Sequence, residues 1–503
     1  MNRLILRQFS LTERRTLCSA ISHNKQVISH IPTRSISMTH TAMRRLQQTK
    51  SMLTPRQAHM STASNLEAIQ AEVITKSNLA VREIVLNRPK KLNALNLDMV
   101  RAIKPELQAW EKSDLAKVIL LKSSGGKGFC AGGDVKTVVD LAQANDPNAS
   151  KFFEEEYQLD HLIGTLETPY VAIMDGITMG GGVGLSVHAP FRIATENTLF
   201  AMPETGIGFL PEVGGSFFLS RLDGQLGTYL GLTGKRLKGT DVFYAGIATH
   251  YVPHARLSAL EARLAELDQA THEMVNQAIE EFSAELETEP LFSLAGEREA
   301  MDRCFKYDTV AEIVEALERE ESGWAKETLD LLHAMSPTSL KVTLQQIRNG
   351  ATLSLAQCFK MEYHLVQKFL QAHDFAEGVT ATLVTRSKPN WEPKQLSQVD
   401  DLQIKKDYFD SPSPQRLELL SNRDYKKYPH RKYMLPSEED IKRVVTGEAA
   451  DAGRYALNRQ QIVDYLVRER QGKQGVKQKV LEVLSRKTVE NKKDDDKSLK
   501  WIY

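Results

Sequence analysis

The sequence predicts an α/β fold in which helices cover the strands, followed by a helical layer. Runs of β-branched and aliphatic residues alternate with amphipathic segments in the first half of the chain, and after about residue 255 only helical periodicity continues. With 503 residues and 41% hydrophobic content, the chain can form a large core plus appendages. No segment approaches the roughly 18 uninterrupted apolar residues that a membrane-spanning helix requires.

Three strands are predicted, and each runs into a turn. Their runs of Val, Ile and Leu, interrupted by Arg82 and Glu83 in the first strand, alternate with helical segments, which is typical of strands covered by helices. A helix is predicted from Asn96 through Trp110, because asparagine is a favoured N-cap and apolar residues recur there at helical spacing. The strands are expected at 81–86, 118–121 and 170–174, and the later helices at 257–286, 310–335 and 340–372.

The net charge of +1 conceals a strong asymmetry along the chain. Residues 1–60 hold ten Lys/Arg and one acid, Glu13, whereas residues 412–503 hold twenty-one Lys/Arg and fourteen acids, so the middle carries −15. The Arg- and Ser-rich, acid-poor start is typical of a mitochondrial transit peptide, and its apolar patch at 4–6 is too short for a secretory signal. We therefore expect a disordered leader over 1–62 and a matrix protein; a basic arm that is never cleaved is the alternative.

Domain boundaries follow from these shifts in composition. The main domain is expected over 63–411, with its core at 70–270 and the helical layer at 271–400. A hinge at 411–414 precedes a basic, mostly helical extension over 412–503. Ser437 with Asp440 and Asn458 with Gln461 resemble helix-capping pairs. The apolar stripes of the extension are narrow, so its helices are expected to need a partner surface to become ordered.

The four cysteines, Cys18, Cys130, Cys304 and Cys358, lie far apart and lack the spacing of a metal site. Without a secretory signal, reduced thiols are expected.

A glycine run at 179–184 (MGGGVG) is the most informative motif. It does not fit a dinucleotide loop, because the last glycine of G-x-G-x-x-G would fall on Leu185, Ser186 or Val187, and no G-K-[ST] of a phosphate loop is present. Close helix packing is the structural alternative.

A second glycine turn at 129–134 (FCAGGD) also follows a strand and precedes a helix. Two such turns can direct bare backbone amides at one carbonyl oxygen that is becoming negative. Glu204 and Glu212 follow the glycine run and supply a candidate base or nucleophile and a second polar contact. For Glu204, an acid at a helix start is the structural alternative.

These motifs together resemble a known family. The segments 87–89 (NRP), 93–95 (NAL), 129–134, 176–184 and 375–379 (FAEGV) are similar to the crotonase, or enoyl-CoA hydratase/isomerase, superfamily. Within it, segments 201–205 (AMPET), 232–239 (LTGKRLKG) and 335–341 (MSPTSLK) resemble the 3-hydroxyisobutyryl-CoA hydrolases. The resemblance covers about residues 70–400.

The resemblance implies a spiral of ββα units in which two backbone amides, those of Gly133 and Gly181, hold the acyl-CoA carbonyl. It implies that Glu204 either attacks the thioester or activates water, and these two routes stay open. Hydratases of the family carry a further glutamate where this chain has Gly184, so hydrolysis is expected rather than hydration. No metal and no cofactor beyond the CoA of the substrate is implied. The implied substrate contacts are Ala131, Asp134, Glu156, Gly180 and Gly182.

Glu212 departs from the family pattern, which usually has aspartate there. The additional methylene extends the side chain by roughly 1.5 Å, and catalytic geometry is sensitive at that scale. Glu212 is expected to orient the substrate hydroxyl, or the site is slow or inactive. Three histidines, His161, His188 and His373, lack ligand partners in the sequence and are expected to be structural.

The sequence and the resemblance therefore suggest two functions. The first is a mitochondrial hydrolase of 3-hydroxyisobutyryl-CoA in valine breakdown. The second is a constituent of the mitochondrial small ribosomal subunit, because fungal hydrolase-like proteins with such extensions resemble one, and its contacts with rRNA would run through 412–503. A solvated basic face is the plain alternative, and a homo-oligomer stays open. The candidate rRNA contacts are Lys426, Lys427, Arg431, Lys432, Lys442, Arg443, Lys473, Lys477, Lys479, Tyr425, Tyr428 and Tyr433.

Overall fold

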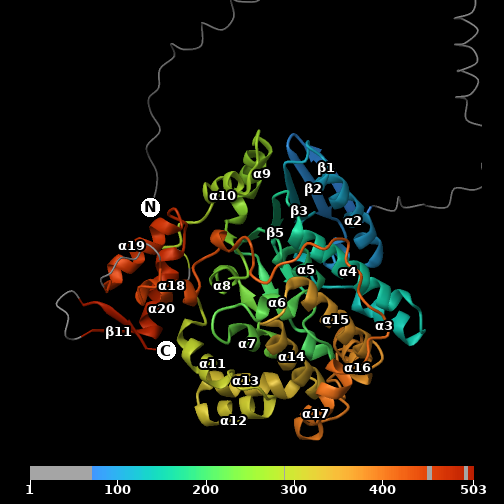
Figure 1. Ribbon diagram of the computed structural model, residues 1–503. Coiled ribbons are helices and arrows are strands. Elements are labelled where there is room, and N and C mark those ends of the chain that lie inside the picture. The colour runs from blue at the N-terminus through green and yellow to red at the C-terminus, as the bar shows by residue number, and fades with distance from the viewer. Residues whose placement is uncertain (1–70, 288, 290, 450–455, 492–496, 503) are drawn as a thin grey trace, which may run out of the picture. The chain divides into compact units, whose positions relative to one another are not determined.

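A six-stranded sheet forms the larger of two sheets in the main body (Figure 1). The computed structural model describes residues 71–287, 289, 291–449, 456–491 and 497–502, so the predicted leader at 1–62 lies outside the described residues. Strands β1 and β2 pair antiparallel, and the remaining neighbours are parallel. The strand order is β1 (Val73–Asn78), β2 (Val81–Leu86), β3 (Val118–Ser123), β5 (Tyr170–Ile173), β7 (Phe191–Ala194) and β10 (His250–Tyr251).

A four-stranded second sheet contains β4 (Gly128–Cys130), β6 (Ile177–Met179), β8 (Leu199–Ala201) and β9 (Leu237–Lys238). Successive strands of the chain alternate between the two sheets, so β3–β4, β5–β6 and β7–β8 each contribute one strand to both. Helices α3 (Val135–Gln143) and α5 (Gly181–Val187) follow the first two of these pairs. The predicted spiral of ββα units is confirmed.

The register of the small sheet brings three loops together. Cys130 of β4 pairs with Thr178 of β6, and Met179 of β6 pairs with Ala201 of β8, all in parallel. Because the carboxyl ends of parallel strands lie at one edge of a sheet, the segments that follow these strands must meet there. Those segments contain both glycine turns and Glu204.

The other helices of the core surround the sheets. Helix α2 (Leu97–Glu111) begins as predicted at Asn96, whose side chain accepts the Met99 N–H. The long α4 (Asn148–Thr165) is buried along most of its length, including its acids Glu155, Glu156 and Asp160. The short helices are α6 (Gly215–Leu219), α7 (Leu226–Thr233) and α8 (Thr240–Tyr244).

The predicted helical layer is present, but each of its long predicted helices is two shorter ones. Internal caps cause the breaks: Glu321 adopts a left-handed φ of 51° before Ser322 caps α13, and Ser354 forms a capping box with Gln357 at the start of α15. The helices of the layer are α9 (Leu257–Ala265), α10 (His272–Glu280), α11 (Arg298–Cys304), α12 (Val310–Glu320), α13 (Gly323–Ala334), α14 (Pro337–Gly350), α15 (Leu355–Phe369), α16 (His373–Val379) and α17 (Asp401–Ile404).

Helices α18 (Glu438–Val445), α19 (Arg459–Glu469) and α20 (Val476–Lys487) form most of the extension. Both predicted capping boxes, at Ser437 and Asn458, are confirmed. A two-stranded sheet, β11 (Thr488–Glu490) with β12 (Leu499–Trp501), was not expected from the sequence. Its strands have only three residues each, too few for a periodic pattern.

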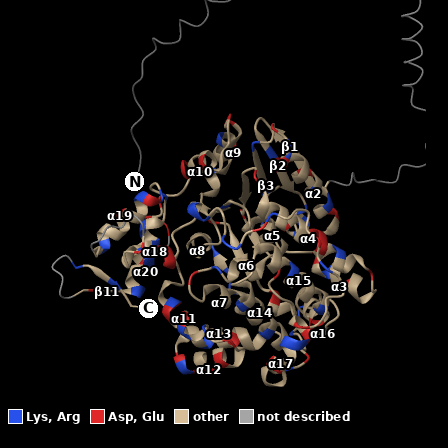
Figure 2. Ribbon diagram, in the orientation of Figure 1, with Lys and Arg blue, Asp and Glu red and all other residues tan. Residues whose placement is uncertain are grey.

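The extension docks on the main body through buried ion pairs. Lys479 and Lys487 of α20 bind Asp223 and Asp302 of the body at 2.8 and 3.0 Å, and Lys473 binds Glu280. Acids from the negative middle of the chain thus neutralise lysines of the basic end, and Figure 2 shows both signs of charge on α18–α20. No helix of the described part is long and apolar enough to cross a membrane.

This docking changes which side chains of the extension face the solvent. Lys473, Lys479 and Tyr433 are buried, and the Tyr428 hydroxyl accepts a hydrogen bond from Arg192 of the body. These groups, expected at an RNA-binding surface, instead hold the extension to the body. Lys426, Lys427 and Arg443 are exposed.

Candidate functional site

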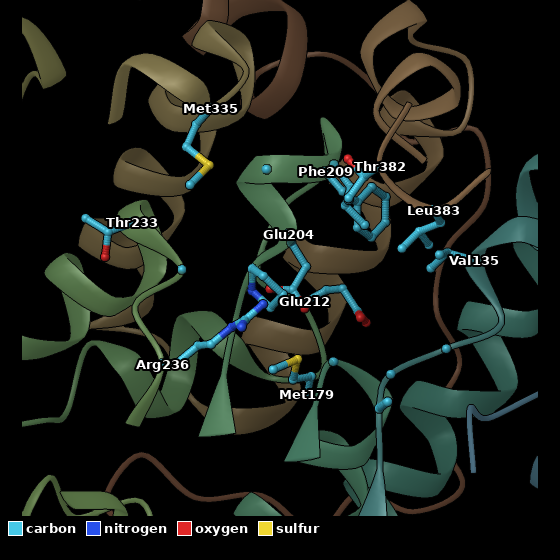
Figure 3. A pocket seen from close by; sticks show the side chains of 18 of the residues that line it. Val135, Met179, Glu204, Phe209, Glu212, Thr233, Arg236, Met335, Thr382 and Leu383 are labelled. Atoms are coloured by element: carbon cyan, nitrogen blue, oxygen red, sulfur yellow. The ribbon is translucent and has the colours of Figure 1, made fainter. Parts of the chain in front are cut away.

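A cavity of about 700 Å³ opens at the edge of the small sheet where β4, β6 and β8 end (Figure 3). The turn after β4 lines it with Ala131, Gly132 and Gly133, and the turn after β6 with Met179 and Gly180. The segment after β8 contributes Pro203, Glu204 and Gly206. The cavity therefore lies where the parallel register brings the sequence motifs together.

The two glycine turns lie side by side, as their motifs predict. A Cβ atom at Gly181 would be 3.5 Å from the Gly133 nitrogen, and one at Gly180 would be 3.9 Å from it. The turns need glycine because Gly132 and Gly180 adopt φ of 116° and 42°. Among the described residues, neither the Gly133 nor the Gly181 N–H donates a hydrogen bond. Two neighbouring backbone donors are thus free to bind one oxygen.

Glu204 lies directly beside these turns. It begins the 3₁₀ turn Glu204–Ile207, and its Oε1 is 3.3 Å from the position of a Cβ at Gly180. The side chain is buried, and Oε2 has no hydrogen-bond partner in the described structure. Burial raises the pKa of Glu204 to about 8. A carboxyl group with a pKa near the ambient pH can accept a proton or attack a carbonyl carbon.

Glu212 also faces the cavity and is labelled next to Glu204 in Figure 3. Its Oε2 accepts the N–H of Val213 at 2.9 Å, so the side chain folds back on its own loop. Burial, and next the negative charges of Glu204 and Glu362, raise the pKa of Glu212 well above its usual value. The longer glutamate stem is therefore accommodated inside the cavity.

Helix α4 supplies two further acids with different environments. Glu155 is paired with Arg101 and Lys104 at 2.9 and 3.1 Å. Glu156 lines the cavity, and neither of its oxygens has a partner among the described residues. A Cβ at Gly181 would lie 2.5 Å from Glu156 Oε1, which places this acid against the second glycine turn. Burial raises the pKa of Glu156 well above its usual value, and the negative charges of Glu212 and Asp160 raise it further.

Two predicted substrate contacts point elsewhere. A Cβ at Gly182 would lie 2.1 Å from the Cys130 carbonyl oxygen, so Gly182 allows α5 to pack against β4. Asp134 binds Arg88 at 2.9 Å. Burial opposes ionisation of Asp134, but the hydrogen bond from Arg88 outweighs it and lowers the pKa of this carboxyl. Neither residue lines the cavity, so their roles as substrate contacts stay predictions.

Asp160 was not anticipated from the sequence. It lies one turn beyond Glu156 on α4 and is fully buried without a hydrogen-bond partner in the described structure. A Cβ at Gly184 would be 2.4 Å from Asp160 Oδ2, so the aspartate fills the space that a side chain at 184 would need. Glycine at position 184 is therefore required by Asp160.

Several cavity residues come from segments without a chemical motif. Lys235 and Arg236, between α7 and β9, line the cavity and are cationic groups suited to the phosphates of a CoA ligand. Leu331 and Met335 come from the end of α13, and Leu383 from the π-helical turn Thr380–Thr385. Of these, Lys235, Arg236 and Met335 fall in segments that resemble the hydrolases, whereas Leu331 and Leu383 gave no signal in the sequence.

The surroundings of the three candidate histidines fit a structural role and not a catalytic one. His188 donates Nε2–H to the Val213 carbonyl at 2.8 Å, and burial lowers its pKa to about 4. His161 is buried without a hydrogen-bond partner in the described part, and His373 contacts Asp374 at 3.1 Å. None of them lines the cavity.

Comparisons with known proteins agree with this geometry. Residues 81–409 match the enoyl-CoA hydratase/isomerase family. A mitochondrial 3-hydroxyisobutyryl-CoA hydrolase of Xenopus laevis is 48% identical over 343 residues, covering 67% of this chain and 87% of that protein. Its human namesake is 44% identical, covering 68% and 89%. The names agree with the predicted mitochondrial location.

A relative with a different name matches a longer part of this chain. The small ribosomal subunit protein mS47 of Neurospora crassa is 45% identical over 505 aligned positions, covering 94% of this chain and 97% of that protein. At that coverage the match includes most of the extension. The two names occur at similar identity.

Solved structures support the fold. The crystal structure of a carnitinyl-CoA dehydratase from Mycobacterium thermoresistibile has a TM-score of 0.65 at 38% identity, covering 70% of this chain and all of that one. An enoyl-CoA hydratase from Rhodobacter sphaeroides gives 0.62 at 31% identity, covering 69% and all of that chain.

Proposed function

The chain belongs to the enoyl-CoA hydratase/isomerase family, and from this premise we propose that it hydrolyses the thioester of 3-hydroxyisobutyryl-CoA to the free acid and CoA. The observation that carries the proposal is the meeting of two unpaired backbone amides, Gly133 and Gly181, with the buried carboxyl of Glu204. Hydrolase relatives at 44–48% identity support the thioester as the substrate class.

The reaction requires charge stabilisation at the acyl oxygen. The two amides donate to that oxygen while ionised Glu204 attacks the carbonyl carbon, and the thiolate of CoA leaves and takes up a proton. Water then cleaves the resulting anhydride. In the alternative route Glu204 removes a proton from water, which attacks directly. Both routes consume one water and yield one acid and one CoA.

Glu212 and Glu156 complete the acyl end of the cavity. Both are buried cavity residues, and the raised pKa of each allows a protonated carboxyl that can donate or accept a hydrogen bond. In the proposal Glu212 binds the 3-hydroxyl of the substrate. This role distinguishes hydroxyacyl thioesters from unsubstituted ones.

Release of CoA by purified protein tests the proposal. The substrates are 3-hydroxyisobutyryl-CoA and 3-hydroxypropionyl-CoA, and the test variants are Glu204→Gln and Glu204→Ala. Glu154→Gln is the matched control, since Glu154 is on the solvent side of α4 and pairs with Lys151. We expect wild-type protein and the control to turn over, and the Glu204 variants to be inactive. Turnover that is equal in the wild type and Glu204→Ala overturns the proposal.

A second function, membership of the mitochondrial small ribosomal subunit, is favoured by one observation. The similarity to mS47 continues through most of the extension, whereas the two hydrolase relatives cover 67–68% of this chain. Exposed Lys426, Lys427 and Arg443 then supply the contacts with rRNA phosphates, since the buried lysines hold the extension to the body.

Sedimentation of the tagged full chain with mitochondrial small subunits tests this function. Charge reversal of Lys426, Lys427 and Arg443 to Glu is compared with reversal of Lys76, an exposed residue of β1. We expect co-sedimentation of the wild type and of Lys76→Glu, and its loss in the triple variant. A wild-type chain that stays at the top of the gradient rules this function out.

A further inference from the structure

The loop Pro211–Gly215, which carries Glu212 into the cavity, has an unusual backbone. Val213 adopts φ of 54° and Gly214 φ of 78°, and the left-handed region is rare for a β-branched residue. Such a conformation persists only where surrounding contacts impose it. The contacts that impose it here therefore determine where the Glu212 carboxyl lies.

Glu362 of α15 makes three of these contacts. Its Oε2 accepts the Gly214 N–H at 2.7 Å, and its Oε1 accepts the Ser216 N–H at 2.8 Å and the Ser216 hydroxyl at 2.5 Å. The carboxyl thus bridges the end of the loop and the first turn of α6. Glu362 is fully buried and is not a cavity residue.

Two neutral side chains hold the rest of the loop. His188 donates to the Val213 carbonyl at 2.8 Å, and Gln346 of α14 donates to the Pro211 carbonyl at 2.6 Å. A Cβ at Gly214 would lie 2.4 Å from His188 Nε2, so this position has no room for a side chain. Of these three side chains that hold the loop, Glu362 is the acidic one.

We propose that Glu362 is a positioning residue that fixes the left-handed turn at Val213 and thereby directs the Glu212 carboxyl at the acyl end of the substrate. The inference rests on the proposed function, because it assigns Glu362 to the hydrolytic site. Glu362 itself touches neither substrate nor reacting atoms. It acts through the Gly214 and Ser216 amides and through its charge.

Acidic groups face Glu212 from several elements. They are Glu204 after β8, Glu156 and Asp160 on α4, and Glu362 on α15, together with the Tyr157 hydroxyl. His188, whose pKa is lowered by burial, contacts the same loop at the Val213 carbonyl. Burial raises the pKa of Glu362 to about 7, against the hydrogen bonds from Ser216 and Gly214. An ionised Glu362 raises the pKa of Glu212, so its replacement by a neutral residue should lower that pKa.

The test compares Glu362→Gln with the wild type in two measurements. The substitution keeps the size of the side chain, removes its charge and places an amide donor against the backbone donors. We expect kcat to fall about 100-fold through displacement of Glu212, with KM for the CoA thioester changed less than about threefold. Thermal melting gives the folded fraction, to which the rates are normalised.

The second measurement is independent of activity. Carboxyl ¹³C NMR of glutamate-labelled protein follows the titration of Glu212, whose signal is assigned by its loss in Glu212→Gln. We expect the Glu212 pKa to be lower by about one unit or more in Glu362→Gln. Inactive wild-type protein would refute the proposed function, and the titration would still decide the role of Glu362.

Ser216→Ala provides a milder variant if Glu362→Gln does not fold. It removes one of the three donors to Glu362 and leaves the charge in place. We expect a smaller loss of kcat in the same direction, about 3- to 10-fold, because the charge and the two backbone hydrogen bonds to Glu362 remain. An unchanged kcat per folded molecule together with an unchanged Glu212 titration would overturn the proposal and leave Glu362 a purely structural group.

Discussion

Glu204 combines a proposed chemical role with a cost in stability, because its carboxyl group is buried. Burial alone raises the pKa of Glu204, and no charged neighbour contributes to this rise. The same desolvation keeps the group protonated up to about pH 8. Activity that needs the ionised carboxylate should therefore rise with pH through this range.

The pH dependence of stability gives a direct test of this environment. The pKa of Glu204 is raised from 4.5 in the unfolded chain to about 8 in the folded protein. The contribution of protonated Glu204 to the free energy of unfolding is therefore fully present below pH 4.5 and is lost as the pH rises to 8. Glu204→Gln removes this dependence. Urea unfolding should show similar stabilities at pH 4.5 and a variant more stable than the wild type by about 4 kcal/mol at pH 8. A constant difference between these pH values would contradict the assignment.

Gly181→Ala tests the turn that pairs with Gly133. The new Cβ would lie 2.5 Å from Glu156 Oε1 and 3.5 Å from the Gly133 nitrogen, so it would occupy space beside both amides. We expect kcat to fall ~100- to 1000-fold, the usual loss for one oxyanion donor. Gly296→Ala is the control, since nothing lies within 4 Å of its added Cβ. Steady-state CoA release measures both variants, and equal rates would remove Gly181 from the site.

At the scale of elements, α20 binds the body through Lys477, Lys479 and Lys487, and the first two of these ion pairs differ in burial. Lys479 and Asp223 are 2.8 Å apart and largely buried, whereas Lys477 and Glu287 are 3.0 Å apart and mostly exposed. Loss of one partner of a buried pair leaves a charge without compensation, whereas an exposed pair is screened by water. The two lysines on one helix therefore form a matched comparison.

We expect Lys479→Ala to lower the free energy of unfolding by about 3–5 kcal/mol and Lys477→Ala by less than about 1 kcal/mol. Although burial opposes ionisation, Lys479 lowers the pKa of Asp223 to about 2. The contribution of Asp223 is therefore present above its usual pKa of 3.8 and is lost as the pH falls towards 2. Urea titrations at pH 7 and pH 3 measure these effects. Equal losses for the two lysines would show that the extension is not held by this pair.

At the scale of the whole molecule, the opposite charges of the middle and the end of the chain meet in the fold. Asp223, Glu280 and Asp302 of the body each bind a lysine of the extension. Truncation after residue 411 should therefore lower the thermal midpoint by several degrees or more, since three body acids lose their partners. Asp223→Asn with Glu280→Gln and Asp302→Asn should recover part of that loss. A truncated chain that melts with the wild type would refute this account, and calorimetry distinguishes the outcomes.

The sequence was sufficient for the fold class, for three strands of the larger sheet and for the motifs that line the cavity. Glycine turns, capping residues and apolar runs are local signals, because they depend on backbone conformations and side-chain periods within a few residues. They predicted strands β2, β3 and β5, helix α2 and both glycine turns, whereas the ββα spiral followed from the resemblance of the motifs to a known family. They failed to place the breaks between successive helices at Ser322 and Ser354, although Gly323 and Gly350 stand at or near these breaks.

Only the tertiary structure revealed Glu362, Asp160 and the buried lysines of the extension. Glu362 acts on a loop about 146 residues earlier in the chain, and Lys473 binds Glu280 across 193 residues. Nothing local distinguishes these side chains from solvated charges, since burial and partners are decided by packing between distant segments. The sequence by itself thus determined the fold class and the motifs that line the cavity, because these depend on local signals. The tertiary structure decided which charged groups are buried near the cavity and which hold the extension in place, because packing between distant segments sets burial and partners.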